Sequence, residues 1–457
     1  MDISAPIFDS EKLKTCRLLS KRVRVKFYRI HDTYSHWNLV EKNINTKDIG
    51  IYIHIPFCRS ICMFCPYFKD VLKNEQELEK YFNFLLKEIK MYGKQLKEND
   101  LNVTDIHVGG GTPSLVPPKL YRELIDTLAQ FFNIKCSIGI EVNPEDFKNR
   151  EYVENLYSAN VDEVSIGVQS FDKRILMSIG RKHSPEDNIK AIENSLKAGF
   201  KWINIDLMIL NPNIKDYIEI PLEEKLKIFR EDMEKCYTLG VHQITFYPTI
   251  IPRSSPGYRL VGYNKLSQEL DSIDLFIDEA IDFAESNNLY FIRVYSISRQ
   301  RYEYATMNSL WIGPLLGFGS GSWSTLSLYQ YINIHNPLKY INLVERDIPP
   351  AIYSRNINPS ARIWRLFFDQ LSSCEISDKA FRLICLNKIP LRIKLLLKIM
   401  EINGLVKRNG DIYRLSRRGI KEVYKSVMNY VTKPVRLAEA ITEISRYEDY
   451  PKIVEIV

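Results

Sequence analysis

The stretch Ile51-Tyr-Ile-His-Ile-Pro-Phe-Cys-Arg-Ser-Ile-Cys-Met-Phe-Cys65 decides the fold of this chain. Five alternating β-forming residues end at Pro56, and three cysteines follow as Cys58, Cys62 and Cys65. An odd number of closely spaced cysteines makes a poor disulfide framework, and three ligands leave a structural zinc site one short. Three thiolates suit a 4Fe–4S cluster whose fourth iron stays open for a small molecule. The alternative is a chance group of buried thiols, which the specific spacing disfavours.

Strand-like and helix-like segments alternate from the cysteine stretch onward. Apolar β-forming runs predict strands at 51–55, 104–108, 137–142, 163–167, 202–207 and 242–247. Amphipathic runs predict helices at 75–95, 117–131, 150–159, 185–198 and 221–239. Such a succession of β-α units is typical of a parallel sheet with right-handed crossovers. We therefore predict an α/β fold built on a partial (β/α)6 barrel of the TIM type.

Chemically unusual residues fall where these predicted strands end. The cysteines follow the first strand, and Gly109-Gly-Gly111 follows the second. Glu141, Gln169 and Asp206 lie at or just past the ends of the next three strands, and Tyr247 lies at the end of the sixth. In a β/α barrel the carboxyl ends of the strands gather at one mouth, where the chemistry takes place. The sequence therefore predicts one shared site.

The cysteine spacing is the signature of the radical S-adenosylmethionine (SAM) enzymes, and the sequence resembles that superfamily. The stretch 52–58, Gly109-Gly-Gly-Thr-Pro-Ser114, Glu141-Val-Asn-Pro144 and Gly167-Val-Gln-Ser-Phe171 resemble the oxygen-independent coproporphyrinogen III oxidase-like family. The resemblance runs from about residue 52 to residue 324, with a weaker likeness in the C-terminal part. That family includes a decarboxylase, haem chaperones, haem-degrading enzymes and methyltransferases.

The resemblance implies cofactors and the residues that hold them. Cys58, Cys62 and Cys65 would bind a 4Fe–4S cluster, and SAM would bind the open iron and be cleaved to methionine and a 5′-deoxyadenosyl radical. The residues expected to contact SAM are Tyr52, Phe64, Gly110, Gly111, Thr112, Glu141, Gln169, Arg181 and Asp206. Glycines let the backbone approach a ligand, and the polar groups match hydroxyls and a carboxylate. Each polar residue, taken singly, also fits a cap or a surface ion pair. Some family members bind a second SAM, so one or two molecules are expected.

Several positions depart from the oxidase pattern. Tyr67 stands where the oxidase often carries a fourth cysteine, and Gly180-Arg-Lys-His183 is closer to the chaperone-like branch. Met208-Ile-Leu-Asn-Pro-Asn213 replaces a glycine-containing stretch, and an additional stretch, 214–221, follows it. The glycine-rich segment 315–324 resembles one that flanks the substrate, and its Trp323 either fills core or stacks on a planar ligand. These departures weaken the expectation of coproporphyrinogen decarboxylation, not that of SAM cleavage.

The predicted function is therefore that of a radical SAM enzyme, an oxidoreductase that abstracts hydrogen from a tetrapyrrole or a similar anionic substrate. A flavodoxin or ferredoxin is the expected type of electron donor. One alternative is methyl or methylene transfer with a second SAM. Another is a haem-binding chaperone, for which His54 and His183 are the candidate haem ligands, although each also fits a structural role.

Composition limits the class of protein. The chain has 457 residues, a net charge of +7 and no apolar run or leader pattern of a membrane protein. Its eight cysteines include one metal-type group, which indicates a reducing compartment, so we expect a cytoplasmic protein. We predict an N-terminal arm at 1–46, the barrel at 47–345 and a lid domain at 346–457. Arg22 and Arg24 in the arm are surface residues or, alternatively, partners of substrate carboxylates.

The C-terminal part has a different pattern. Helices are predicted at 362–372, 378–386 and 391–402, followed by a hairpin with Asn409-Gly410 at its tip and a further helix from Arg418. This order is typical of a winged-helix-like domain. Basic residues on the hairpin and next to it would fit DNA binding, and they are Lys407, Arg408, Arg414, Arg417 and Arg418. Because the related family uses a similar domain to cover its barrel, we expect a lid and no nucleic-acid partner.

Overall fold

The computed structural model describes residues 25–65, 67–213, 218–249, 251, 272–301, 314–381, 388–428 and 452–456. Arg22, Arg24 and the first half of the additional stretch at 214–221, residues 214–217, therefore lie outside the described residues.

The six predicted strands are confirmed, and all six run parallel. They are β2 (Asp48–Ile55), β5 (Asn102–Gly110), β7 (Ile138–Val142), β8 (Val161–Gln169), β9 (Trp202–Ile209) and β10 (Gln243–Pro248). They are hydrogen-bonded in the order β10-β9-β8-β7-β5-β2, which is the reverse order of the chain. Their residues are buried on both faces, as expected of parallel strands covered by helices.

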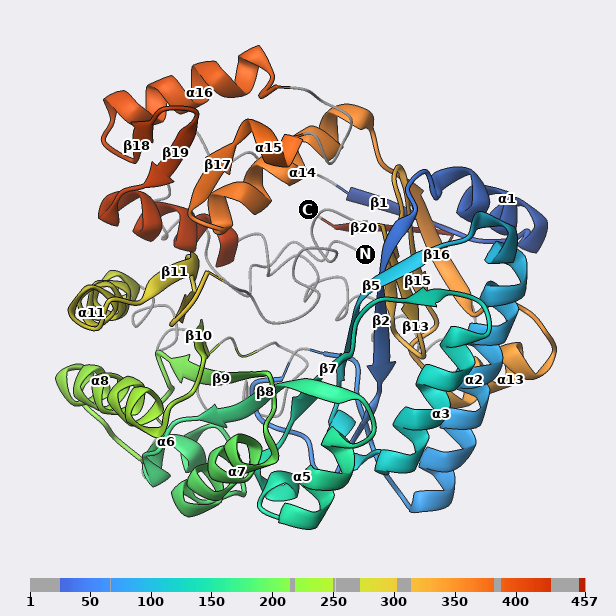
Figure 1. The fold of residues 1–457 in the computed structure, drawn as a ribbon, viewed down its shortest axis with the longest axis horizontal. Helices are drawn as coiled ribbons and strands as arrows, with labels where there is room; N and C mark the ends of the chain where they lie inside the picture. Colours follow the sequence, from blue (N-terminus) through green and yellow to red (C-terminus); the bar gives the residue numbers. More distant parts are fainter. Residues whose placement is uncertain are drawn as a thin grey trace.

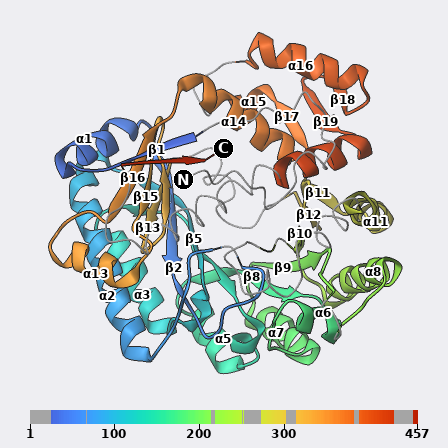
Figure 2. The ribbon, with the colours of Figure 1, turned by 180° about the vertical axis from the view of Figure 1, so that it is seen from behind.

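The five predicted helices are also confirmed, and Figures 1 and 2 show them on the outside of the curved sheet. They are α2 (Glu75–Leu96), α3 (Pro118–Ala129), α5 (Arg150–Tyr157), α7 (Pro185–Ala198) and α8 (Leu222–Leu239). Local chemistry fixes their ends: Ser184 and Asp187 form a capping box at the start of α7, and Gly199 ends it with φ +86°. The result is a partial (β/α)6 barrel.

The sheet continues well beyond the six predicted strands. On one edge β13 (Leu315–Phe318) pairs in parallel with β2, and antiparallel strands follow it, namely β14 (Trp323–Thr325), β15 (Tyr329–Asn333), β16 (Ala351–Asn356), β1 (Val25–Arg29) and β20 (Ile453–Ile456). On the other edge lie β12 (Ser296–Ser298) and β11 (Tyr290–Arg293). Strands from all three predicted domains are thus neighbours in one sheet, and the domain boundaries remain predictions.

Shorter elements and further helices complete the barrel. They are α1 (Thr33–Asn43), β3 (Phe57–Cys58), β4 (Asp70–Val71), β6 (Asn133–Ile134), α4 (Pro144–Phe147), α6 (Lys173–Ser178), α11 (Ile273–Ser286), α13 (Pro337–Glu345) and the 3-10 turns Lys97–Asn99 and Pro113–Leu115.

The C-terminal part has the predicted order of helices and hairpin, together with one strand, β17, that was not predicted. Residues 382–386 of the predicted helix at 378–386 lie outside the described residues. Its elements are α14 (Pro359–Ser372), β17 (Glu375–Ser377), α15 (Asp378–Phe381), α16 (Leu391–Ile402), β18 (Val406–Asn409) and β19 (Ile412–Leu415). The strands form a separate sheet in the order β17-β19-β18, and residues 417–428 are helical. Gly410, with φ +61°, closes the predicted hairpin.

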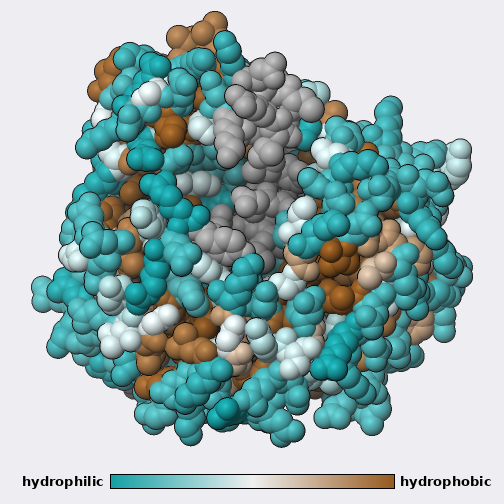
Figure 3. All heavy atoms as spheres, in the orientation of Figure 1, coloured by the Kyte–Doolittle hydropathy of each residue, from teal (hydrophilic) through white to brown (hydrophobic). Residues whose placement is uncertain are grey.

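The surface of the face seen in Figure 3 is mainly hydrophilic, with hydrophobic residues in scattered groups. Among the helices that the structure describes, none is long and apolar enough to cross a membrane.

Candidate functional site

Hydrogen bonds hold the cysteine loop in place at Cys58, Met63 and Cys65. The amide of Leu72 donates to the carbonyl of Cys58 at 3.0 Å, where β3 pairs with β4. Lys69 Nζ donates to the carbonyl of Cys65 at 2.6 Å, and the amide of Met63 donates to the carbonyl of Ile179 at 3.4 Å. The loop therefore holds all three cysteines above the carboxyl end of β2, as predicted.

The three cysteines are free thiols that influence one another. Burial raises the pKa of Cys58 to about 11, with Cys65 and Cys62 contributing in the same direction and the Thr112 hydroxyl opposing it. Burial also raises the pKa of Cys65, against the opposing charge of Lys69. The thiols of Cys58 and Cys65 therefore carry protons in the free protein, and metal binding must release them.

The donor set fits a 4Fe–4S cluster chemically. Within the described residues, no three His, Cys, Asp or Glu side chains are placed to share a single metal ion. A 4Fe–4S cluster does not require this, because each of its cysteines binds a separate iron. Next to the loop, the Nε–H of Arg181 is buried and has no hydrogen-bond partner in the described part of the chain. This orphaned donor points to a ligand beside the thiols.

The glycine run at the end of β5 lies directly against the cysteine loop. The amide of Gly111 donates to the carbonyl of Ile55, and the amide of Thr112 donates to the carbonyl of Phe57, each at 2.7 Å. A Cβ on Gly111 would lie 2.5 Å from the Phe57 carbonyl oxygen, and one on Gly110, with φ +113°, would lie 2.7 Å from the His54 ring. Only glycine allows this approach.

Two histidines orient the residues at the ends of β2 and β7. His54 Nε2 contacts the Phe68 carbonyl at 3.0 Å, and because a carbonyl only accepts, Nε2 carries the proton. The Tyr52 hydroxyl then donates to His54 Nδ1 at 2.8 Å. His107 Nε2 lies 3.1 Å from Glu141 Oε1, whose other oxygen accepts from the amide of Gly110 at 3.3 Å. The strands thereby fix Tyr52 and Glu141 beside the glycines.

Both histidines considered as haem ligands are engaged within the protein. His54 is 3% exposed, and both of its ring nitrogens have protein partners. His183 is 5% exposed, and its Nε2 donates to the Val168 carbonyl at 3.3 Å. Burial lowers the pKa of both imidazoles, so each is neutral at pH 7. These contacts favour the structural role for each histidine.

The remaining predicted SAM contacts converge at the ends of β8 and β9. A Cβ on Gly167 would lie 2.8 Å from both Arg181 Nη2 and Gln169 Nε2. Arg181 Nη1 donates to Asn143 Oδ1 at 3.0 Å, and its guanidinium carbon lies 5.8 Å from the ring centre of Phe64. These side chains therefore come together from four separate parts of the chain.

Asp206 is a carboxyl group of this site, and its pKa depends on several of the neighbouring side chains. It accepts from Ser165 Oγ at 2.9 Å and from Asn204 Nδ2 at 3.0 Å. Burial raises the pKa of Asp206 to about 7; Glu141 acts in the same direction, while Ser165, Asn204 and Arg181 oppose it. The carboxyl group therefore changes its charge close to neutral pH.

Two tyrosines interact with the charges of these carboxylates: Tyr67, which was not predicted as a site residue, and Tyr247, which was expected at the mouth of the barrel without an assigned role. Tyr67 and Tyr247 are 61% and 38% exposed, and their phenol pKa values are raised by the surrounding protein and by the charges of Glu141 and Asp206. The Tyr247 ring centre lies 5.6 Å from that of Tyr295. The positions of Tyr67 beside Cys65 and of Tyr247 at a strand end were the available signals.

The sequence departures have structural explanations. Leu210 adopts φ +54° just after β9, a conformation that favours glycine. The neighbouring Asn211 holds this turn, donating to the Met208 carbonyl at 2.8 Å and accepting from the Thr249 hydroxyl at 2.9 Å. Trp323 packs edge to face on Phe27 with ring centres 5.5 Å apart, which supports its core-filling role.

The sequence of this chain is similar to those of known proteins. Residues 52–220 match the family model described as the radical SAM superfamily. The heme chaperone HemW of Bacillus subtilis is 23% identical over 80% of this chain and 95% of the relative. The oxygen-independent coproporphyrinogen-III oxidase-like protein HemZ of the same organism is 29% identical over 49% of this chain and 45% of the relative.

A solved structure shows the same fold. The coproporphyrinogen III oxidase HemN from Escherichia coli, described as a radical SAM enzyme, superposes with a TM-score of 0.71 over 88% of this chain and 94% of that one. The two sequences are 19% identical, so the likeness establishes the fold alone.

Proposed function

We propose that this chain cleaves SAM at a cluster on its cysteine loop, because residues 52–220 match the radical SAM superfamily model and the chain resembles both heme chaperones and oxygen-independent coproporphyrinogen III oxidases. The hydrogen donor in this proposal is a tetrapyrrole or a similar anionic substrate. Bound to Cys58, Cys62 and Cys65, a 4Fe–4S cluster would supply one electron to the sulfonium of SAM.

One observation carries this proposal: a cysteine loop, a glycine run packed against it and a group of polar side chains share the carboxyl ends of one parallel sheet. Gly110 and Gly111 allow the glycine run to lie directly against the cysteine loop and the His54 ring. Glu141 and Asp206 offer acceptors for an amine or for ribose hydroxyls, and Arg181 retains an unused donor for a carboxylate. SAM carries an amine, ribose hydroxyls and a carboxylate, which match these side chains.

A haem chaperone is the second candidate, and the relatives favour it. Heme chaperones named HemW match this chain over 80% and 64% of its length, in Bacillus subtilis and in Lactococcus lactis. Tyr67 stands two residues past Cys65, where the oxidase often carries a fourth cysteine, and Pro66-Tyr67-Phe68 resembles the chaperone and methyltransferase branches. In this second candidate the same cluster site is retained, and haem is bound without net oxidation.

Parallel anaerobic incubations distinguish the candidates. The reconstituted protein is mixed with SAM and dithionite, and either coproporphyrinogen III or haem is added before mass spectrometry. Decarboxylated or otherwise oxidised tetrapyrrole formed in step with 5′-deoxyadenosine supports the enzyme. Stoichiometric haem binding with neither substrate changed supports the chaperone. S-adenosylhomocysteine among the products would instead indicate methyl transfer.

A further inference from the structure

The turn that follows β8 holds one of the expected SAM contacts in a strained conformation. Gln169 adopts φ +68°, a left-handed conformation that is unfavourable for a residue with a side chain. Between the pairs Ile166–Ile205 and Gln169–Leu207, β8 advances three residues while β9 advances two. This bulge turns the Gln169 side chain toward Arg181, since both lie against the α-carbon of Gly167.

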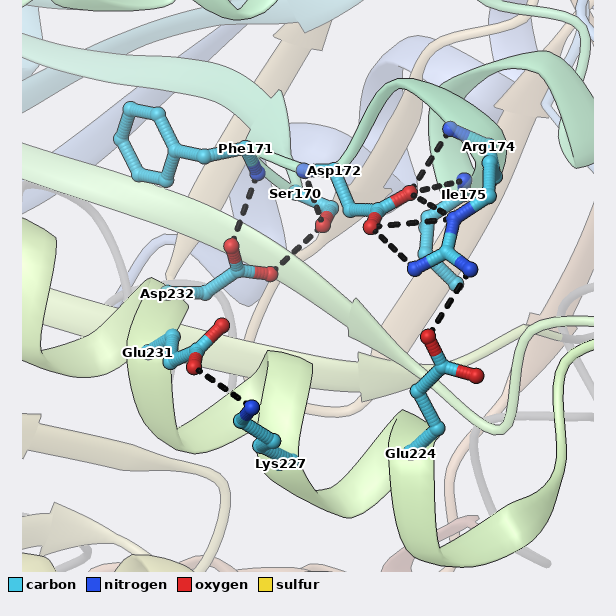
Figure 4. Close-up of polar contacts among 9 residues, drawn as sticks. All are labelled: Ser170, Phe171, Asp172, Arg174, Ile175, Glu224, Lys227, Glu231 and Asp232. Carbon is cyan, nitrogen blue, oxygen red and sulfur yellow. Dashed lines mark hydrogen bonds and ion pairs between the residues drawn. The ribbon is translucent and has the colours of Figure 1, made fainter.

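A buried carboxylate from α8 holds this turn. Asp232 is 4% exposed; its Oδ2 accepts from the Ser170 hydroxyl at 2.6 Å, and its Oδ1 accepts from the amide of Phe171 at 2.8 Å. Figure 4 shows the carboxylate reaching from the helix to both groups. Ser170 Oγ in turn accepts from the amide of Asp172 at 3.0 Å. Asp232 therefore fixes three consecutive residues directly after Gln169.

Other contacts support the turn but do not replace Asp232. Asn188 on α7 donates to the Ser170 carbonyl at 2.9 Å. On the outer side, Arg174 bridges Asp172 and Glu224, as Figure 4 also shows. Ion pairs as exposed as these contribute little to stability. A buried acceptor that bonds two donors at once is much stronger, and its loss leaves both donors unsatisfied.

Burying a carboxyl group is unfavourable. A buried carboxyl group at this position therefore indicates a specific role. Burial raises the pKa of Asp232 to about 7, and the neighbouring Asp172 and Glu231 act in the same direction, while its two hydrogen bonds oppose them. The buried thiol of Cys236 on the same helix is a further titratable neighbour. A group that served only to fill this space would be better apolar.

We propose that Asp232 is a positioning residue that acts through Ser170 and Phe171 to hold the Gln169 amide toward bound SAM. This inference rests on the function proposed above. It predicts that Asp232 contributes to SAM binding only as long as Gln169 is present.

A double-mutant cycle on the cluster-loaded protein tests this dependence. The dissociation constant of SAM is measured by equilibrium dialysis for wild type, Asp232→Ala, Gln169→Ala and the double variant. We expect Asp232→Ala and Gln169→Ala each to weaken SAM binding roughly tenfold, and the double variant to be no weaker than Gln169→Ala. Asp232→Asn should be intermediate, because its amide oxygen still accepts from Phe171.

Glu163→Gln is the matched control, since Glu163 is a buried carboxyl group near the opposite end of β8. It should leave SAM affinity unchanged. If Asp232→Ala does not fold, the cycle is run with Asp232→Asn. Independent, multiplicative effects of the two substitutions would overturn the inference, as would unchanged affinity in a folded Asp232 variant. Absence of SAM binding by the cluster-loaded wild type would overturn the proposed function as well.

Discussion

At the scale of single residues, Gly111 shows how closely the glycine run and the cysteine loop depend on each other. Gly111→Ala would place a methyl group 2.5 Å from the Phe57 carbonyl oxygen, so the backbone just before Cys58 must shift. We expect lower iron content after reconstitution and weaker SAM binding, measured by iron analysis and equilibrium dialysis. Gly240→Asn is the control, because nothing lies within 4 Å of its added Cβ and asparagine tolerates the left-handed conformation. Full iron content in Gly111→Ala would contradict the predicted contact.

Asp206 predicts a pH dependence of SAM binding. Its pKa of about 7 means that the carboxyl group is neutral in mildly acidic solution and charged in alkaline solution. The charged form is the better acceptor for hydroxyls and for an amine. SAM affinity should therefore fall as the pH drops from 8 to 6, and Asp206→Asn should be weaker but flat over this range. The same slope in wild type and Asp206→Asn would assign the titration to another group.

The positions of the cysteines, the glycines, Glu141, Gln169 and Asp206 were predictable, because each lies at or near a strand end that the sequence marks. Arg181 came from the family resemblance, and the contacts of all these residues with SAM remain predictions. Asn143 and Ser165 were not predicted, although they hold Arg181 and Asp206. Their role depends on which strands are neighbours and in which register. Neither the order β9-β8-β7 nor the bulge in β8 can be predicted from the sequence of any single segment.

At the scale of elements, the buried Glu88 connects α2 to the glycine-rich turn between β13 and β14. It accepts from the amide of Gly319 at 2.8 Å, from Asn333 Nδ2 at 2.7 Å and from the Tyr340 hydroxyl at 2.6 Å. Tyr81, also on α2, donates to the His54 carbonyl at 2.8 Å. The helix thus links the turn to the strand that carries the cysteine loop.

Glu88 predicts a pH dependence of stability. Burial raises its pKa from 4.5 to about 7, so its contribution is fully present below about pH 4.5 and is lost as the pH rises toward 7. Each pKa unit corresponds to about 1.4 kcal/mol. Glu88→Gln should reduce the fall in the free energy of unfolding between pH 5 and pH 8, measured by denaturant titration. An unchanged slope would contradict the assignment to Glu88.

The strands and helices of the barrel were predictable because their hydrophobic periodicity is strong and local. The extension of the sheet was not, since β16, β1 and β20 join residues near both ends of the chain. Such long-range pairing leaves no local pattern. The contact between Glu88 and Gly319 could not be predicted for the same reason, because the two residues are far apart in sequence.

At the scale of the whole molecule, the C-terminal helix at 417–428 packs against the barrel. Arg417 pairs with Asp278 and Asp282 on α11, and Lys421 also pairs with Asp278. The Tyr424 ring stacks on Phe246 of β10 with ring centres 6.0 Å apart. Basic residues considered for DNA binding are thus partly used within the chain, which supports the lid interpretation.

Removing these two kinds of contact should lower the free energy of unfolding by different amounts. Tyr424→Ala removes a fully buried ring and should destabilise the protein by roughly 3–5 kcal/mol. Arg417→Ala removes exposed ion pairs and should cost about 1 kcal/mol or less. Both are measured by denaturant unfolding at low and at high salt, and only the Arg417 effect should shrink with salt. Equal effects of the two substitutions would contradict this packing.

The most direct test of the central claim is the formation of 5′-deoxyadenosine by anaerobically reconstituted protein given SAM and dithionite. Wild type is compared with Cys62→Ala and with Cys374→Ala, since Cys374 lies between α14 and β17 in the C-terminal part. We predict 5′-deoxyadenosine from wild type and Cys374→Ala, and none from Cys62→Ala. Cluster-loaded wild type that forms no 5′-deoxyadenosine, or equal amounts from all three proteins, would contradict SAM cleavage at this cysteine loop.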